Sequence, residues 1–85
     1  MLFQIEIPDY TPESGIDYEW ADGHEIAVTL GANEVRISAN KAGLITLARF
    51  LLNLAQDEVR SGTHIHFDSG IALKDGSIDL IVSRM

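Results

Sequence analysis

The stretch from Lys41 to Arg60, KAGLITLARFLLNLAQDEVR, constrains the fold most, because no other segment is long and apolar enough to nucleate a core. At 3.6 residues per turn, one face of this predicted helix collects Leu44, Leu47, Ala48, Phe50, Leu51, Leu54 and Ala55. The opposite face collects Thr46, Arg49, Asn53, Gln56, Asp57 and Arg60. The border residues Ile45, Leu52 and Val59 widen the apolar arc, so we expect two surfaces to cover this helix.

Alternating apolar and polar residues predict strands on both sides of the helix. The predicted strands are residues 2–7, 25–30, 35–39, 63–68 and 77–83, and a short strand at 16–20 is an additional candidate. A turn at residues 31–33 would join two strands into a hairpin. Asp75-Gly76 predicts a second hairpin, with Leu73 opposite Ile78 and Ile71 opposite Leu80.

These elements predict an α+β fold in the order β-β-β-α-β-β. A four- to five-stranded antiparallel sheet would carry the helix, at about residues 40–60, on one face. Either Ser38 or Asn40 would cap its N-terminus, and Arg60 and Gly62 would mark its C-terminal end. The predicted core comprises Leu47, Leu51, Ile65, Phe67 and Leu80.

Length and composition predict a single domain over residues 1–85. The chain has no cysteine, so neither a disulfide framework nor a thiolate metal site is available. No apolar run approaches the length of a membrane span, and the N-terminus lacks the features of a secretory signal. We therefore expect a cytoplasmic protein that does not insert into a membrane.

The net charge of −7 is unevenly distributed along the chain. Residues 1–35 carry eight acidic side chains and no Lys or Arg, whereas residues 36–85 carry six basic and five acidic side chains. Proteins that grip nucleic acids need a basic stripe, so nucleic-acid binding is not expected. The N-terminal third suits a basic partner, although acidity that only keeps the protein soluble is an equally good interpretation.

A long acidic loop at residues 9–23 interleaves these carboxylates with aromatic side chains, and loops of this length are often functional. Packing of Trp20 into the core is the preferred interpretation, in which case Tyr10 and Tyr18 would provide more of the anchoring. The predicted partner-binding residues are Asp9, Tyr10, Glu13, Asp17, Tyr18, Glu19, Trp20, Asp22 and Glu25.

The sequence His64-x-His66-x-Asp68 is the only constellation with a chemical interpretation. Alternate strand residues lie about 7 Å apart on one face, so both imidazoles could reach one metal ion. His24 or Asp79 would have to supply a third ligand. The better interpretation is a solvated sheet face that carries no metal. Phosphate loops, cysteine nucleophiles and serine elbows are missing, so we expect neither a cofactor nor enzyme activity.

Three segments between residues 37 and 84 read ISANKAGLITLARFLLNLAQDEVRSG, HIHFDSG and GSIDLIVSR. They resemble a family of small immunity proteins from bacterial polymorphic-toxin systems, whereas the first 35 residues match only loosely. The resemblance implies a non-enzymatic protein that binds and neutralises a cognate toxin. Many such toxins attack nucleic acids, so we expect the toxin to be basic.

Two further expectations stand beside this interpretation. The alternative function is a small metal- or ligand-binding domain that uses His64 and His66. Ile45, Leu52 and Val59, at seven-residue spacing, also favour a weak homodimer.

Overall fold

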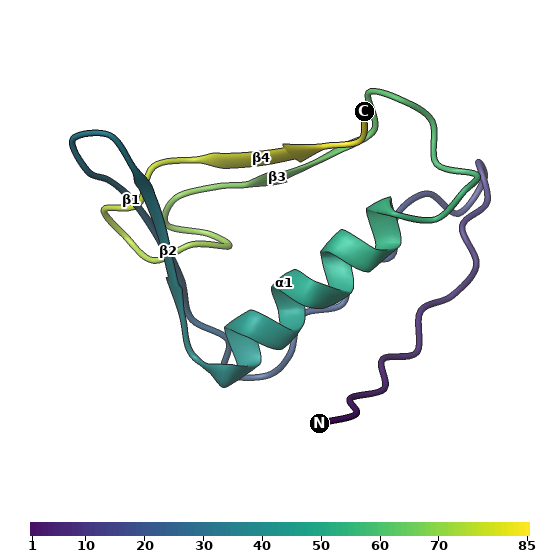
Figure 1. The fold of residues 1–85 in the computed structure, drawn as a ribbon, viewed down its shortest axis with the longest axis horizontal. Coiled ribbons are helices and arrows are strands. Elements are labelled where there is room, and N and C mark those ends of the chain that lie inside the picture. The colour runs from purple at the N-terminus through teal and green to yellow at the C-terminus, as the bar shows by residue number, and fades with distance from the viewer.

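The computed structural model describes residues 1–85 as an α+β fold with one helix and two small antiparallel sheets (Figure 1). The elements follow the order β-β-α-β-β. They are β1 (Ile26–Leu30), β2 (Val35–Ala39), α1 (Lys41–Leu54), β3 (His64–Phe67) and β4 (Leu80–Ser83). The strands form two sheets of two strands each, β1–β2 and β3–β4, in place of the single larger sheet predicted from the sequence.

Both sheets are hairpins with a defined register. The β1–β2 hairpin, which places Val28 opposite Ile37, confirms the prediction for residues 25–39. The predicted pairing around Asp75-Gly76 is wrong, because β4 pairs directly with β3 and places Leu80 opposite Phe67. The chain turns out of β3 at Gly70, whose φ of +78° is readily adopted only by glycine.

The segment between β3 and β4 links the two hairpins without forming a strand. The Lys74 N–H donates to the Ile26 carbonyl at 2.8 Å, and the Ile78 N–H donates to the Val28 carbonyl at 3.0 Å. These two bonds satisfy carbonyls along the outer edge of β1. Because residues 74–77 turn between the two bonds, no continuous ladder extends from one hairpin to the other.

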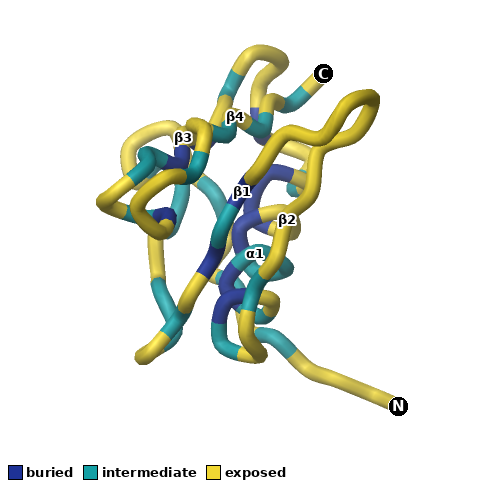
Figure 2. The backbone as a smooth tube through the Cα atoms, turned by 90° about the vertical axis from the view of Figure 1, so that its left-hand side faces the viewer, coloured by how far each residue is buried: buried dark blue, intermediate teal, exposed yellow.

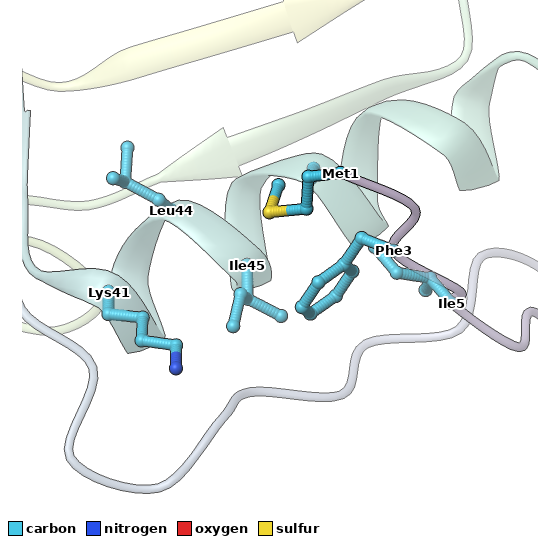
Figure 3. A pocket seen from close by; sticks show the side chains of 7 residues that line it. Met1, Phe3, Ile5, Lys41, Leu44 and Ile45 are labelled. Atoms are coloured by element: carbon cyan, nitrogen blue, oxygen red, sulfur yellow. The ribbon is translucent and has the colours of Figure 1, made fainter.

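Residues 2–7 are not a strand, and neither are residues 16–20. The N-terminal segment makes no backbone–backbone hydrogen bond and runs along α1 instead. Phe3 and Ile45 point toward the same space in Figure 3. They contribute to an open hollow of about 620 Å³ that is lined by Met1, Phe3, Ile5, Lys41, Leu44, Ile45 and Ala48. The N-terminal segment therefore packs against the wide apolar arc of the helix and does not pair with a strand.

Helix α1 begins where the sequence predicts and ends earlier than predicted. The Asn40 side chain caps it by accepting from the Gly43 N–H at 2.8 Å and also accepts from the Glu25 N–H at 3.0 Å. At the other end, one Arg84 Nη1 donates to the carbonyls of Leu54 and Gln56 at 2.7 and 2.9 Å. Arg84 thus takes the role predicted for Arg60, since it satisfies carbonyls that a helix ending at Leu54 leaves open.

The core lies between α1 and the inner faces of the two hairpins (Figure 2). Ile65 and Phe67 are buried as predicted, and Leu47 and Leu80 pack partly buried against the core. Leu51 was predicted to be core, but half of its surface is exposed, at 50%. The buried residues of the helix are Gly43, Thr46, Phe50, Asn53 and Leu54, so its buried face is rotated from the predicted one.

Two polar side chains are buried on that face because the surrounding backbone gives them partners. Thr46 Oγ1 donates to the Ala42 carbonyl at 2.8 Å and accepts from the Ala21 N–H at 3.0 Å. Asn53 Nδ2 donates to the Arg49 carbonyl at 2.9 Å. Burying a polar group that has a hydrogen-bond partner costs little free energy. Residues that the helical pattern assigns to solvent can therefore lie in the interior.

Candidate functional site

Residues 9–25, hereafter the acidic segment, are held on α1 by Arg49. Its Nη2 lies 3.0 Å from Asp17 Oδ2 and 2.9 Å from Glu19 Oε2, and its Nη1 donates to the Glu6 carbonyl. Only 16% of the Arg49 side chain is exposed. One arginine in the middle of the helix therefore fixes both the acidic segment and the N-terminal segment before it.

Backbone hydrogen bonds fix the acidic segment at further points. The Tyr10 N–H donates to Gln56 Oε1 at 2.8 Å, and the Ala21 N–H donates to Thr46 Oγ1. Between them, the Thr11 and Ser14 side chains close a turn with a hydroxyl-to-hydroxyl distance of 2.8 Å. The segment is thus preorganised although it contains no strand, which reduces the entropy lost when a partner binds.

The predicted acidic residues fall into paired and unpaired groups. Asp17 and Glu19 share the single positive charge of Arg49, and Glu25 lies 3.5 Å from Lys74 Nζ. Asp9, Glu13 and Asp22 are exposed and form no ion pair. The negative potential that this segment offers to a partner therefore comes mainly from the unpaired group.

The three predicted aromatic anchors differ in exposure. Trp20 packs edge-to-face on Phe50 and Phe67, with ring centroids 4.7 and 5.9 Å apart, and is partly buried. Tyr10 is also partly buried against the core. Tyr18 touches Phe50 at 5.7 Å and keeps 54% of its surface exposed. The interpretation of Trp20 as a packing residue is the one that this geometry favours, and Tyr18 is the most accessible anchor.

Of the predicted metal ligands, the structure brings together only His66 and Asp79. His66 Nε2 lies 3.5 Å from Asp79 Oδ2 and 3.2 Å from Asp68 Oδ1. His64 faces the Gly62 carbonyl at 3.2 Å, and His24 stacks on Trp20, so neither belongs to this group. The Ser69 N–H donates to Asp79 Oδ1 at 2.9 Å, and this bond, with a smaller contribution from His66, lowers the pKa of Asp79.

Sequence reasoning did not recognise the part played by Arg49. The helical pattern assigned it to the solvated face, whereas it is the only basic residue that pairs with the first 24 residues. One signal was available: an N-terminal third with eight acids and no Lys or Arg needs a cation from elsewhere in the chain. A mid-helix arginine is a suitable source, because its long side chain can reach across the helix surface.

A match to a protein-family model spans most of the fold described above. The family model of immunity protein 32 matches residues 34–85, which include β2, α1, β3 and β4. The chain belongs to the immunity protein 32 family. No curated protein and no solved structure is significantly similar to the chain. The acidic segment of this immunity protein precedes the matched region. No helix of the protein has the length and apolarity needed to cross a membrane.

Proposed function

We propose that this protein neutralises a cognate bacterial toxin by binding a basic surface of that toxin through the acidic segment. Membership of an immunity protein family supports a toxin-neutralising role. The role requires binding and no chemical step, so we propose a non-enzymatic inhibitor that acts in the cytoplasm of the cell it protects.

The observation that carries the choice of surface is the charge of the acidic segment. Asp9, Glu13 and Asp22 are exposed and unpaired on a segment whose backbone is fixed to α1. A toxin that acts on nucleic acid must present Lys and Arg to phosphates, so its active-site surface would be complementary. Complementary charge accelerates association, and Tyr18 offers an exposed ring that can slow dissociation.

The position of this segment relative to the family match gives a second argument. A scaffold shared by a family does not by itself distinguish one cognate toxin from another, whereas a segment outside it can vary. The acidic segment lies outside residues 34–85 and still packs on the matched helix. We therefore assign recognition of the particular toxin to this segment and its support to the matched region.

The test replaces the three unpaired acids together, as Asp9→Asn, Glu13→Gln and Asp22→Asn. The matched control is Asp57→Asn, Glu58→Gln and Asp75→Asn, which removes the same charge from exposed, unpaired positions elsewhere. Association with the toxin encoded beside this protein is measured by stopped flow over a salt series. At low salt we expect the first variant to associate about tenfold or more slowly and the control less than about twofold more slowly.

At high salt the difference between the two variants should disappear, because screening removes the steering. Tyr18→Ala should mainly raise the dissociation rate, by about tenfold for a loss of roughly 1.4 kcal/mol. Equal association rates for the two charge variants at every salt concentration would show that the acidic segment serves only solubility. A toxin that binds neither wild type nor variants would reject the function itself.

We also propose weak self-association through the outer face of α1. Leu44, Leu51 and Leu52 are each about half exposed there, whereas Val59, predicted to share this face, is buried. In sedimentation equilibrium we expect a dimer at high protein concentration, because pairing would cover this apolar surface. A Leu44→Gln and Leu51→Gln double variant should remain monomeric. If wild type stays monomeric at the same concentration, the proposed dimer is wrong, and only the N-terminal segment covers this face.

A further inference from the structure

A compact group of metal-ligating side chains lies on the outer face of the β3–β4 hairpin. Figure 1 shows this hairpin on the opposite side of α1 from the N-terminal segment. His66 belongs to β3, Asp68 follows β3 and Asp79 precedes β4. One nitrogen and two carboxylate oxygens, one atom from each residue, all lie within 4.8 Å of one another.

The register of the hairpin explains why these three side chains meet. Phe67 lies opposite Leu80, so the next position of the same register sets Asp68 against Asp79. Like charges directly opposite each other on neighbouring strands are destabilising. His66 lies two residues before Asp68 on the same face and points its Nε2 toward both carboxylates. A cation placed among the three groups would remove the repulsion.

The two distances from His66 to the carboxylates match the ligand spacing around a first-row transition metal. Zinc bonds of about 2.0–2.2 Å in tetrahedral geometry place neighbouring ligand atoms roughly 3.3–3.6 Å apart. The two distances from His66 Nε2, 3.2 and 3.5 Å, are close to this range. The Ser69 N–H fixes Asp79 through Oδ1 and leaves Oδ2 directed to the group, as an outer-shell partner of a ligand does.

We propose that His66, Asp68 and Asp79 form a binding site for a divalent zinc-like cation with an open fourth position. An imidazole nitrogen with two carboxylate oxygens suits zinc better than calcium or magnesium, which prefer oxygen ligands alone. The sequence predicted no metal here, because it offered two histidines of one strand and did not show that a third ligand lies near them. The hairpin supplies Asp68 and Asp79 instead, and His64 plays no part. The proposal does not depend on toxin binding.

The test is calorimetric titration of the untagged, full-length protein with zinc at neutral pH, in a buffer that does not bind metal. We expect saturable one-to-one binding. His66→Gln and Asp79→Asn should each weaken it by at least about tenfold, because even an outer-shell partner is worth that much. His64→Gln is the matched control, since it removes a neighbouring exposed histidine outside the group, and should change the affinity less than about twofold.

A second measurement separates binding from folding. Circular dichroism of each variant without metal should match wild type, since the His66 and Asp79 side chains are about half exposed and His64 is exposed. In wild type, zinc should shift the ring resonances of His66 in NMR spectra while those of His64 stay in place. The proposal is overturned if zinc fails to saturate one site by about 1 mM, which would leave a plain ion pair between His66 and the aspartates. It is equally overturned if His64→Gln weakens binding as much as His66→Gln.

Discussion

Replacing Phe50 by Ala is expected to lower the free energy of unfolding by about 3–5 kcal/mol. Phe50 is fully buried at the centre of the core. Its ring contacts Tyr18, Trp20 and Phe67, with centroid distances between 4.7 and 5.8 Å. Truncation would therefore remove the surface on which the acidic segment and the β3–β4 hairpin both pack.

Leu51→Ala is the matched control for this prediction, because it shortens the next side chain of the same helix. Leu51 is half exposed, so we expect a loss below about 1 kcal/mol, where the helical pattern alone would predict a core-sized cost. Urea titration followed by circular dichroism measures both variants. If Phe50→Ala does not fold, Phe50→Leu keeps the comparison measurable. A larger loss for Leu51→Ala than for the Phe50 variants would contradict the observed orientation of α1.

The sequence predicted the elements of this fold better than their arrangement. Period-two alternation located the β1–β2 hairpin and the inward side chains Ile65 and Phe67 correctly, since those signals depend on neighbouring residues only. The prediction of which face of α1 is buried was wrong, because the apolar side chains were all assumed to be the buried ones. Thr46 and Asn53 are buried with hydrogen-bond partners, one of them supplied by Ala21 in the acidic segment, and such distant partners leave no local signal.

The same limit applies to the strands and to the candidate site. Residues 2–7 alternate like a strand, but alternation cannot choose between pairing in a sheet and packing on a helix. The group formed by His66, Asp68 and Asp79 depends on the β3–β4 register. The Asp75-Gly76 signal pointed to a different pairing and kept Asp79 away from Asp68. The acidity of residues 9–25 was visible from composition, but the division into paired and unpaired carboxylates depends on where Arg49 lies.

The arrangement around Arg49 also connects stability with the proposed recognition surface. Phe50 buries its ring under the acidic segment, and the adjacent Arg49 holds the same segment by charge. Arg49 and Phe50, which are consecutive residues of α1, thus fix the acidic segment to the helix. The acidic segment lies outside the family match, whereas the helix lies inside it. Changes at the exposed acids can therefore alter recognition without altering the core, provided that Arg49 keeps its partners.

Arg49→Met is expected to lower the free energy of unfolding by about 1–3 kcal/mol. The substitution keeps an apolar stem of similar length and removes the bonds to Asp17, Glu19 and the Glu6 carbonyl. The two carboxylates would then repel each other without a counterion. The buried Nε of Arg49 has no partner, which offsets part of what the other nitrogens contribute and keeps the expected loss within this range.

Arg36→Met is the control for Arg49→Met, because Arg36 pairs with Glu34 at 3.9 Å while both side chains remain mostly exposed. Exposed pairs contribute about 0–1 kcal/mol, so its stability should hardly change. Limited proteolysis adds a local measurement: Arg49→Met should accelerate cleavage within residues 1–25, and Arg36→Met should not. Slow cleavage of that region in Arg49→Met would mean that aromatic packing on Phe50 holds the acidic segment without the arginine. The recognition surface would then depend on the core alone.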